Sequence, residues 1–106
     1  MNTRLITEVS KLQSQMKHWM DTMHRRPELS MQEFDTAKYI AELVKSFGAY
    51  ELVEGVGKNG MVATLKVGDG TKTIGLRAEF DALPIQEDNN LPYKSQCDGK
   101  SHLCGH

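Results

Sequence analysis

Two residues near the end of the sequence, Cys104 and His106, have the types and the spacing of metal ligands. In an extended segment, residues two positions apart point to the same side. A thiolate sulfur and an imidazole nitrogen would then converge on a divalent ion such as Zn²⁺, at about 2.3 Å and about 2.0–2.1 Å respectively. Because an open zinc site usually keeps three protein ligands, we expect further ligands from elsewhere.

Two acidic residues, Glu79 and Asp81, follow a strand-like run and precede the sequence Ala-Leu-Pro. Loops on a rigid scaffold are common places for functional sites, and an imidazole ligand usually donates its second N–H to a carboxylate. The two acids are therefore candidates for the surroundings of a metal held by Cys104 and His106. A solvated acidic loop explains the same residues if no such metal is bound.

The length and composition fit one modest domain. The chain has 106 residues, of which 25% are charged, and a net charge of −1. Such a charge gives no basic field for nucleic acid or anionic lipid, and no apolar run has the length of a membrane span or the form of a signal peptide. We therefore expect no nucleic-acid or membrane partner and a cytoplasmic location, where Cys97 and Cys104 are thiols or ligands rather than a disulfide.

The first half of the chain has the apolar spacing of two helices. The spacing predicts one helix from about Thr3 to Met23, ended by Pro27, and a second over residues 31–47 with a capping box of Ser30 and Glu33. The apolar stripe of the first helix is too short for a coiled coil, so we expect it to pack in the core. The stripe consists of Leu5, Val9, Leu12, Met16, Trp19 and Met23.

Four further polar residues in this half have simple structural interpretations. Glu28 and Glu33 resemble a catalytic carboxylate pair, but solvation and capping at a helix start explain them with less strain. His18 and His24 lie off the apolar stripe or at its end, and we expect both to be solvated.

The second half of the chain is strand-like. The segments 61–67 and 73–79, with Gly-Asp-Gly between them, predict an antiparallel hairpin. Residues 55–60 match the dinucleotide pattern G-x-G-x-x-G, but a strand-like run rather than a helix follows, so we interpret them as a flexible connection between strands. The predicted fold class is α/β, with two helices followed by strands of a mixed and incomplete sheet.

Three blocks of sequence, in the same order, resemble a family of metal-dependent amidohydrolases. The blocks are His24 to Glu33, Leu76 to Ile85 and His102 to His106, and Leu91 to Ser95 fits between the last two. The family includes hippurate hydrolase, N-acyl-amino-acid hydrolases and plant auxin-conjugate hydrolases, within the wider aminoacylase and carboxypeptidase metallopeptidase group. The resemblance implies that residues 1–106 are the N-terminal portion of a catalytic domain of this type.

The resemblance also implies roles for three residues. Cys104 and His106 match the metal ligands of the family, and Asp81 matches an acid that orients a ligand. In the family, two divalent ions (Zn, Mn, Co or Ni) acidify a bridging water for attack on a small amide such as an N-acyl amino acid. Glu79 stands where the family usually has Asp, which leaves open whether it contacts the metal.

In the family, the Cys-Gly-His motif is followed by an Asp-Gly-His continuation, the general-base glutamate, two further histidines and a lid or dimerisation domain. These parts lie beyond the 106 residues. We therefore expect weak metal binding or none, no activity of this chain alone, and self-association through apolar surface that the missing parts would cover.

Two other classes of protein fit part of the pattern. One is a non-catalytic helical interaction module that uses the apolar stripe. The other is a small structural zinc module, although structural sites favour ligand pairs two to four residues apart on a turn. Its ligands would be Cys97, His102, Cys104 and His106.

Overall fold

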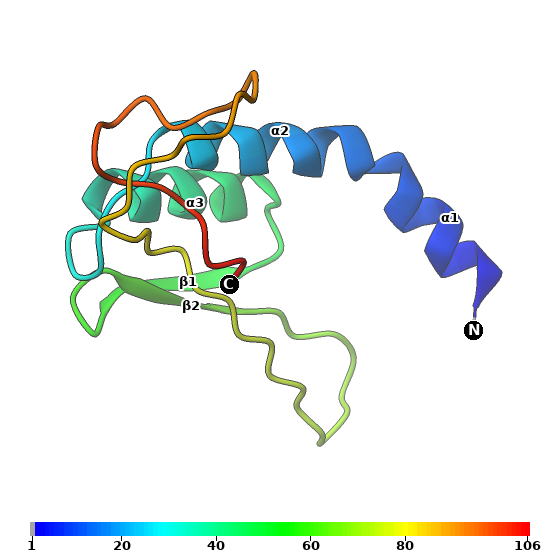
Figure 1. Ribbon diagram of the computed structural model, residues 1–106. Coiled ribbons are helices and arrows are strands. Elements are labelled where there is room, and N and C mark those ends of the chain that lie inside the picture. Colours follow the sequence, from blue (N-terminus) through cyan, green and yellow to red (C-terminus); the bar gives the residue numbers. More distant parts are fainter. Residues whose placement is uncertain (1) are drawn as a thin grey trace.

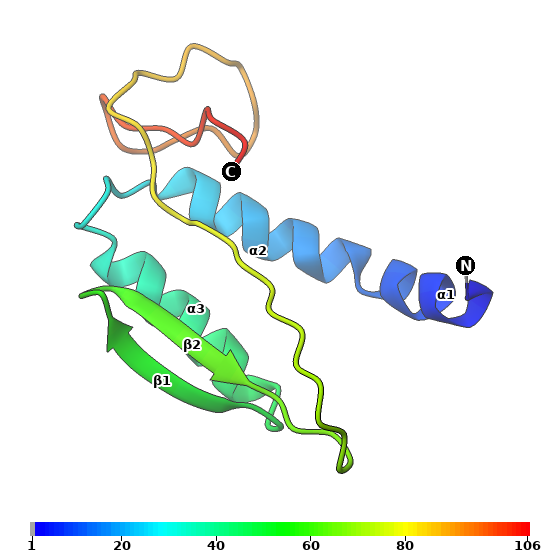
Figure 2. The same cartoon turned by 90° about the horizontal axis from the view of Figure 1, so that it is seen from below.

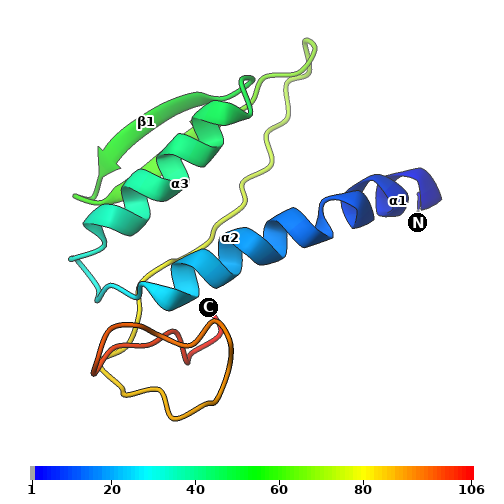
Figure 3. The same cartoon turned by 90° about the horizontal axis from the view of Figure 1, so that it is seen from above.

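The computed structural model describes residues 2–106. Its elements in chain order are α1 (Thr3–Lys11), α2 (Gln13–Arg25), α3 (Phe34–Ser46), β1 (Glu51–Val56) and β2 (Gly60–Thr64). The hairpin of β1 and β2 packs on α3, and α2 lies on the other side of α3 (Figure 1, Figure 2). The loops after residue 80 lie over the end of α2 (Figure 3). The three helices and two strands of the described residues confirm the predicted α/β class. None of the helices in residues 2–106 has both the length and the apolar character needed to cross a membrane.

The predicted N-terminal helix is present but is divided at Leu12 into α1 and α2. The Leu12 amide donates to the Val9 carbonyl at 3.0 Å, so the ladder tightens to i−3 spacing at this point. The Ser10 hydroxyl also donates to the Ile6 carbonyl at 2.8 Å, a contact that often bends helices. The division therefore has a local cause in the hydrogen bonding of α1.

Only the last two residues of the apolar stripe are covered. Trp19 and Met23 are half-buried, and the Trp19 ring lies 5.7 Å from that of Phe47, which follows α3. The other four are exposed, and α1 extends beyond the packed part of the molecule (Figure 1), so the prediction of core packing is wrong there. The exposed residues are Leu5 (61%), Val9 (48%), Leu12 (48%) and Met16 (40%).

The start of α3 is capped by Glu28 rather than by the predicted Ser30 and Glu33 box. The Glu28 carboxylate accepts the Thr36 amide and the Thr36 hydroxyl, each at 2.6 Å, and the Asp35 amide at 3.3 Å. A carboxylate at this position satisfies amides that lack an intrahelical partner and faces the positive end of the helix dipole. The interpretation of Glu28 as a capping residue is confirmed.

Glu33 connects the start of α3 to the hairpin. Its carboxylate accepts the Met31 amide at 2.8 Å and the Asn59 side-chain amide at 3.0 Å. Burial opposes its ionisation, but these hydrogen bonds and the charge of Lys58 outweigh burial and hold the pKa of Glu33 below its ordinary value. The residue therefore fixes the position of the turn between β1 and β2.

The strands pair antiparallel with Val53 opposite Val62, so the predicted pairing of 61–67 with 73–79 is wrong. The chain turns between Val56 and Gly60, where Gly57 and Lys58 have φ of +60° and +85°. Glycine adopts positive φ without strain, which permits the reversal here. The interpretation of residues 55–60 as a connection between strands is confirmed, and residues 73–79 form no strand.

Backbone hydrogen bonds, rather than long strands, hold the segment after residue 80. The Ala82 amide donates to the Glu28 carbonyl at 2.8 Å, and Leu83 and Ser101 exchange amide hydrogen bonds at 2.9 and 3.0 Å. The Ser101 hydroxyl, which is fully buried, donates to the Ile85 carbonyl at 2.5 Å. These contacts place residues 81–85 beside residue 101.

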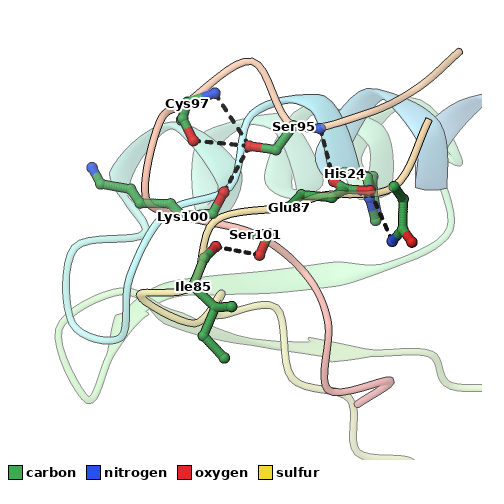
Figure 4. A network of polar contacts seen from close by, with 8 residues as sticks. His24, Ile85, Glu87, Ser95, Cys97, Lys100 and Ser101 are labelled. Carbon is green, nitrogen blue, oxygen red and sulfur yellow. Dashed lines mark hydrogen bonds and ion pairs between the residues drawn. The ribbon is translucent and has the colours of Figure 1, made fainter. Parts of the chain in front are cut away.

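Glu87 is a fully buried carboxylate in the same region (Figure 4). It lies 3.0 Å from His24 Nε2 and accepts the Ser95 amide at 2.9 Å and the Asn89 side-chain amide at 3.4 Å. Burial opposes its ionisation, but the hydrogen bonds from Ser95, His24 and Asn89 outweigh burial and hold the pKa of Glu87 below its ordinary value. The expectation that His24 is solvated is wrong, because Glu87 holds its ring.

We expect the stability contributed by Glu87 to depend on pH. Because its folded pKa is lowered, the contribution is present above about pH 4.3, the ordinary glutamate pKa, and is lost as pH falls through the folded pKa. Glu87→Gln should therefore unfold at lower urea concentration than the wild type at about pH 7, and this difference should shrink at about pH 3. A difference that stays constant with pH, or that the exposed Glu51→Gln control reproduces, would contradict this.

Candidate metal centre

A cavity of about 290 Å³ lies where α2 meets the two segments that carry the candidate ligands. Met20, Met23 and His24 of α2 form one wall. The other walls come from residues 79–83 and 101–106. The bridge between Leu83 and Ser101 brings these two segments together, so that residues distant in sequence face one space.

Glu79, Asp81 and His106 meet in this cavity, with a ligand atom of each within 4.8 Å of the others. His106 Nδ1 lies 3.8 Å from Asp81 Oδ1 and 4.0 Å from Glu79 Oε2. Ligand atoms about 2.0–2.1 Å from a tetrahedral ion lie about 3.3 Å apart, so a small inward movement would suffice to bind one. Two carboxylates and an imidazole therefore fit a divalent ion such as Zn²⁺ or Mn²⁺.

The side chains of this group are partly open to solvent. The exposed fractions are 41% for Glu79, 29% for Asp81 and 26% for His106. Glu79 also accepts a hydrogen bond from the Arg77 guanidinium. Partial exposure leaves room for water or a substrate atom beside a bound ion, as a catalytic site requires.

The structure brings the predicted residues Asp81 and His106 together, whereas Cys104 lies outside the group. Cys104 lines the same cavity and its thiol is free. Gly105 has a φ of +86°, so residues 104–106 turn instead of forming the extended segment assumed from the spacing. Cys104 as a metal ligand therefore stays a prediction.

Glu79 and His102 are two cavity residues to which the sequence assigned no definite role in a catalytic metal site. Glu79 lies nearly as close to His106 as Asp81 does, and the spacing of the two acids was the available signal. His102 also lines the cavity, and its Nε2 is buried without a hydrogen-bond partner in the described part of the chain. In the sequence, the position of His102 two residues before Cys104 is the only indication that it lies in this cavity.

The surroundings of His102 favour its neutral form. Burial lowers its pKa first, and the neighbouring His24 and His106 lower it further, whereas Asp81 acts in the opposite direction. The ring centroids of His102 and His24 are 6.1 Å apart. His24 therefore lies near both Glu87 and His102, and His102 lines the same cavity as the ligand group.

Relatives of known name match most of this chain, although no family model matches it. Hippurate hydrolase of Campylobacter jejuni is 48% identical over 102 residues, which are 96% of this chain and 26% of the relative. Thermostable carboxypeptidase 1 of Saccharolobus solfataricus is 41% identical over 85 residues, which are 79% of this chain and 21% of the relative.

Two solved structures share the fold. A crystal structure described as an aminohydrolase of methicillin-resistant Staphylococcus aureus has a TM-score of 0.91 and 43% identity, covering 100% of this chain and 28% of that one. A dinuclear metal-binding peptidase of the M20 family from Bacillus subtilis has a TM-score of 0.84 and 36% identity, covering 92% of this chain and 27% of that one. The predicted resemblance is confirmed: the chain is a relative of the metal-dependent amidohydrolases and M20 peptidases, and it spans about a quarter of their length.

Proposed function

We propose that this chain supplies part of the metal site of an amidohydrolase that acts on N-acyl amino acids or similar small amides. Residues 1–106 would form the N-terminal portion of the catalytic domain, with the lid or dimerisation domain outside it. The observation that carries the proposal is the meeting of Asp81 and His106, 3.8 Å apart, in a cavity that Cys104 also lines. The hippurate hydrolase of C. jejuni supports the substrate class by its name. The two free cysteines fit the cytoplasmic location that we propose.

The roles of the residues follow from their donor atoms. In this proposal Asp81 orients the ring rather than binding the ion: its Oδ1 lies 3.8 Å from His106 Nδ1 and, after a small movement, would accept the Nδ1 proton and leave Nε2 for the ion. The Cys104 thiolate supplies a second ligand, and Glu79 adds negative charge that favours a cation. A divalent ion in such a site lowers the pKa of a bound water and polarises an amide carbonyl. The apolar side chains of Met20 and Met23 would limit the access of bulk water from α2.

The ligand assignment predicts an unequal effect of the two cysteines on metal binding. Cys104→Ser should weaken Co²⁺ binding by tenfold or more, on the order expected when a ligand group is altered, because a hydroxyl is a poor substitute for a thiolate. Cys97→Ser should leave binding unchanged, and it is the matched control. Titration followed by the ligand-field bands of Co²⁺ gives the affinities, and the thiolate-to-cobalt charge-transfer band should be absent in Cys104→Ser and retained in Cys97→Ser. Equal losses would favour the structural zinc module.

Catalysis by this chain alone is not expected. Two or three ligands leave the remaining positions of an ion to water, so binding is weak. A proton acceptor for the attacking water is also needed, and we place it outside these residues. The purified chain with Mn²⁺ or Zn²⁺ should not release benzoate from hippurate, whereas a full-length relative assayed in parallel should. Turnover by the chain alone would contradict this part of the proposal.

We also propose that the chain self-associates through the exposed apolar stripe of α1. Leu5 and Val9 are 61% and 48% exposed, and large exposed apolar surface favours association. Sedimentation should show a mass above that of the monomer at high protein concentration, and Leu5→Glu should reduce it. The matched control is Thr7→Glu on the same helix, which adds the same charge away from the stripe. A monomer at all concentrations would exclude this surface as an interaction site.

A further inference from the structure

Glu87 joins three parts of the molecule that surround the candidate metal centre. It is fully buried and lies 3.0 Å from Nε2 of His24, in the last turn of α2. It also accepts the Ser95 amide, in the loop that leads to the ligand segment 102–106. Figure 4 shows Glu87 between these two partners. The Glu87 carboxylate therefore connects the end of α2 to the loop that contains Ser95.

His24 is held on two sides and lies against the ligand segment on a third. Its side chain is 16% exposed, and the Tyr93 ring meets it edge-on with centroids 5.3 Å apart. The His102 ring lies 6.1 Å away on the cavity side, with its Nε2 unpartnered among the described residues. Glu87 therefore fixes the orientation of the His24 ring, and this ring is the neighbour of His102 in the cavity wall.

A second connection runs from Glu87 to the start of the ligand segment. The Ser95 amide is bound to Glu87, and the Ser95 hydroxyl donates to the Lys100 carbonyl at 2.7 Å. The next residue, Ser101, donates its hydroxyl to the Ile85 carbonyl at 2.5 Å. The two residues that precede His102 are thus held by side-chain hydrogen bonds, Lys100 to Ser95 and Ser101 to Ile85 (Figure 4).

We infer that Glu87 and His24 are positioning residues for the metal ligands of this chain, acting through His102 and Ser95. The inference rests on the proposed metal centre. Neither residue belongs to the ligand group, and both act on the segment that carries Cys104 and His106. A buried carboxylate is costly unless it is fully hydrogen-bonded, and such a pair fixes distances and directions that apolar packing leaves free. Contacts of this kind around metal ligands typically affect affinity by about 10–100-fold.

The test compares Co²⁺ affinity and spectrum among variants of the same chain. Glu87→Gln keeps the shape but removes the charge, and His24→Asn removes the nitrogen that reaches Glu87. Each should bind Co²⁺ about tenfold more weakly than the wild type, with altered ligand-field bands. The matched control is His18→Asn, the same substitution at an exposed position of α2, which should leave both unchanged. Far-UV circular dichroism at the titration temperature identifies the variants that are folded.

The outcomes separate this inference from the proposal on which it rests. Folded Glu87→Gln and His24→Asn proteins with wild-type affinity and spectrum would show that the pair stabilises the fold only, and would overturn it. If Glu87→Gln does not fold, His24→Asn decides, since His24 is partly exposed and its loss is less disruptive. A wild-type chain that binds no Co²⁺ would overturn the metal centre, and this inference with it.

Discussion

The candidate centre depends on the short antiparallel bridge between Leu83 and Ser101. Its two backbone hydrogen bonds, at 2.9 and 3.0 Å, join the segment that carries Asp81 to the segment that carries His106. Buried backbone groups need partners, so this pairing resists a change of register. A slip by one residue would reverse the faces of the side chains on one segment and would turn Asp81 away from His106. The geometry of the site is therefore set first by the backbone.

Polar contacts hold much of this fold together because its apolar core is small. The buried hydrophobic residues among those described are Ala41 and Ala82, whereas Ile74 and Leu76 are 88% and 96% exposed. A core of this size contributes little to stability. Buried or half-buried glutamates instead accept backbone amides at the main junctions, and Glu87 does so beside the metal cavity. Catalytic use of these acids would conflict with their structural role.

The sequence predicted the elements of this fold better than their partners. Apolar periodicity identified the helical regions, although the first predicted helix is divided at Leu12 and most of its apolar stripe is exposed. Strand propensity could not identify the partner of residues 61–67, because it reports only that a segment suits a half-buried pleated surface. The partner strand is instead set by the turn at Gly57 and Lys58. Likewise, the types and spacing of the acids indicated the site. The contact between His24 and Glu87 joins residues 63 positions apart, which no local pattern encodes.

The turn at Gly105 bears on how the two predicted ligands, Cys104 and His106, act together. Its φ of +86° is strained for other residues, and a Cβ added there would meet no atom within 4 Å, so backbone conformation rather than space favours glycine. The turn separates the thiol from the group of Glu79, Asp81 and His106. That group offers hard oxygen donors and an imidazole, whereas Cys104 offers a soft sulfur. Joint binding of one ion by the thiol and this group would therefore need a change of backbone conformation near residue 105, which glycine permits at little cost.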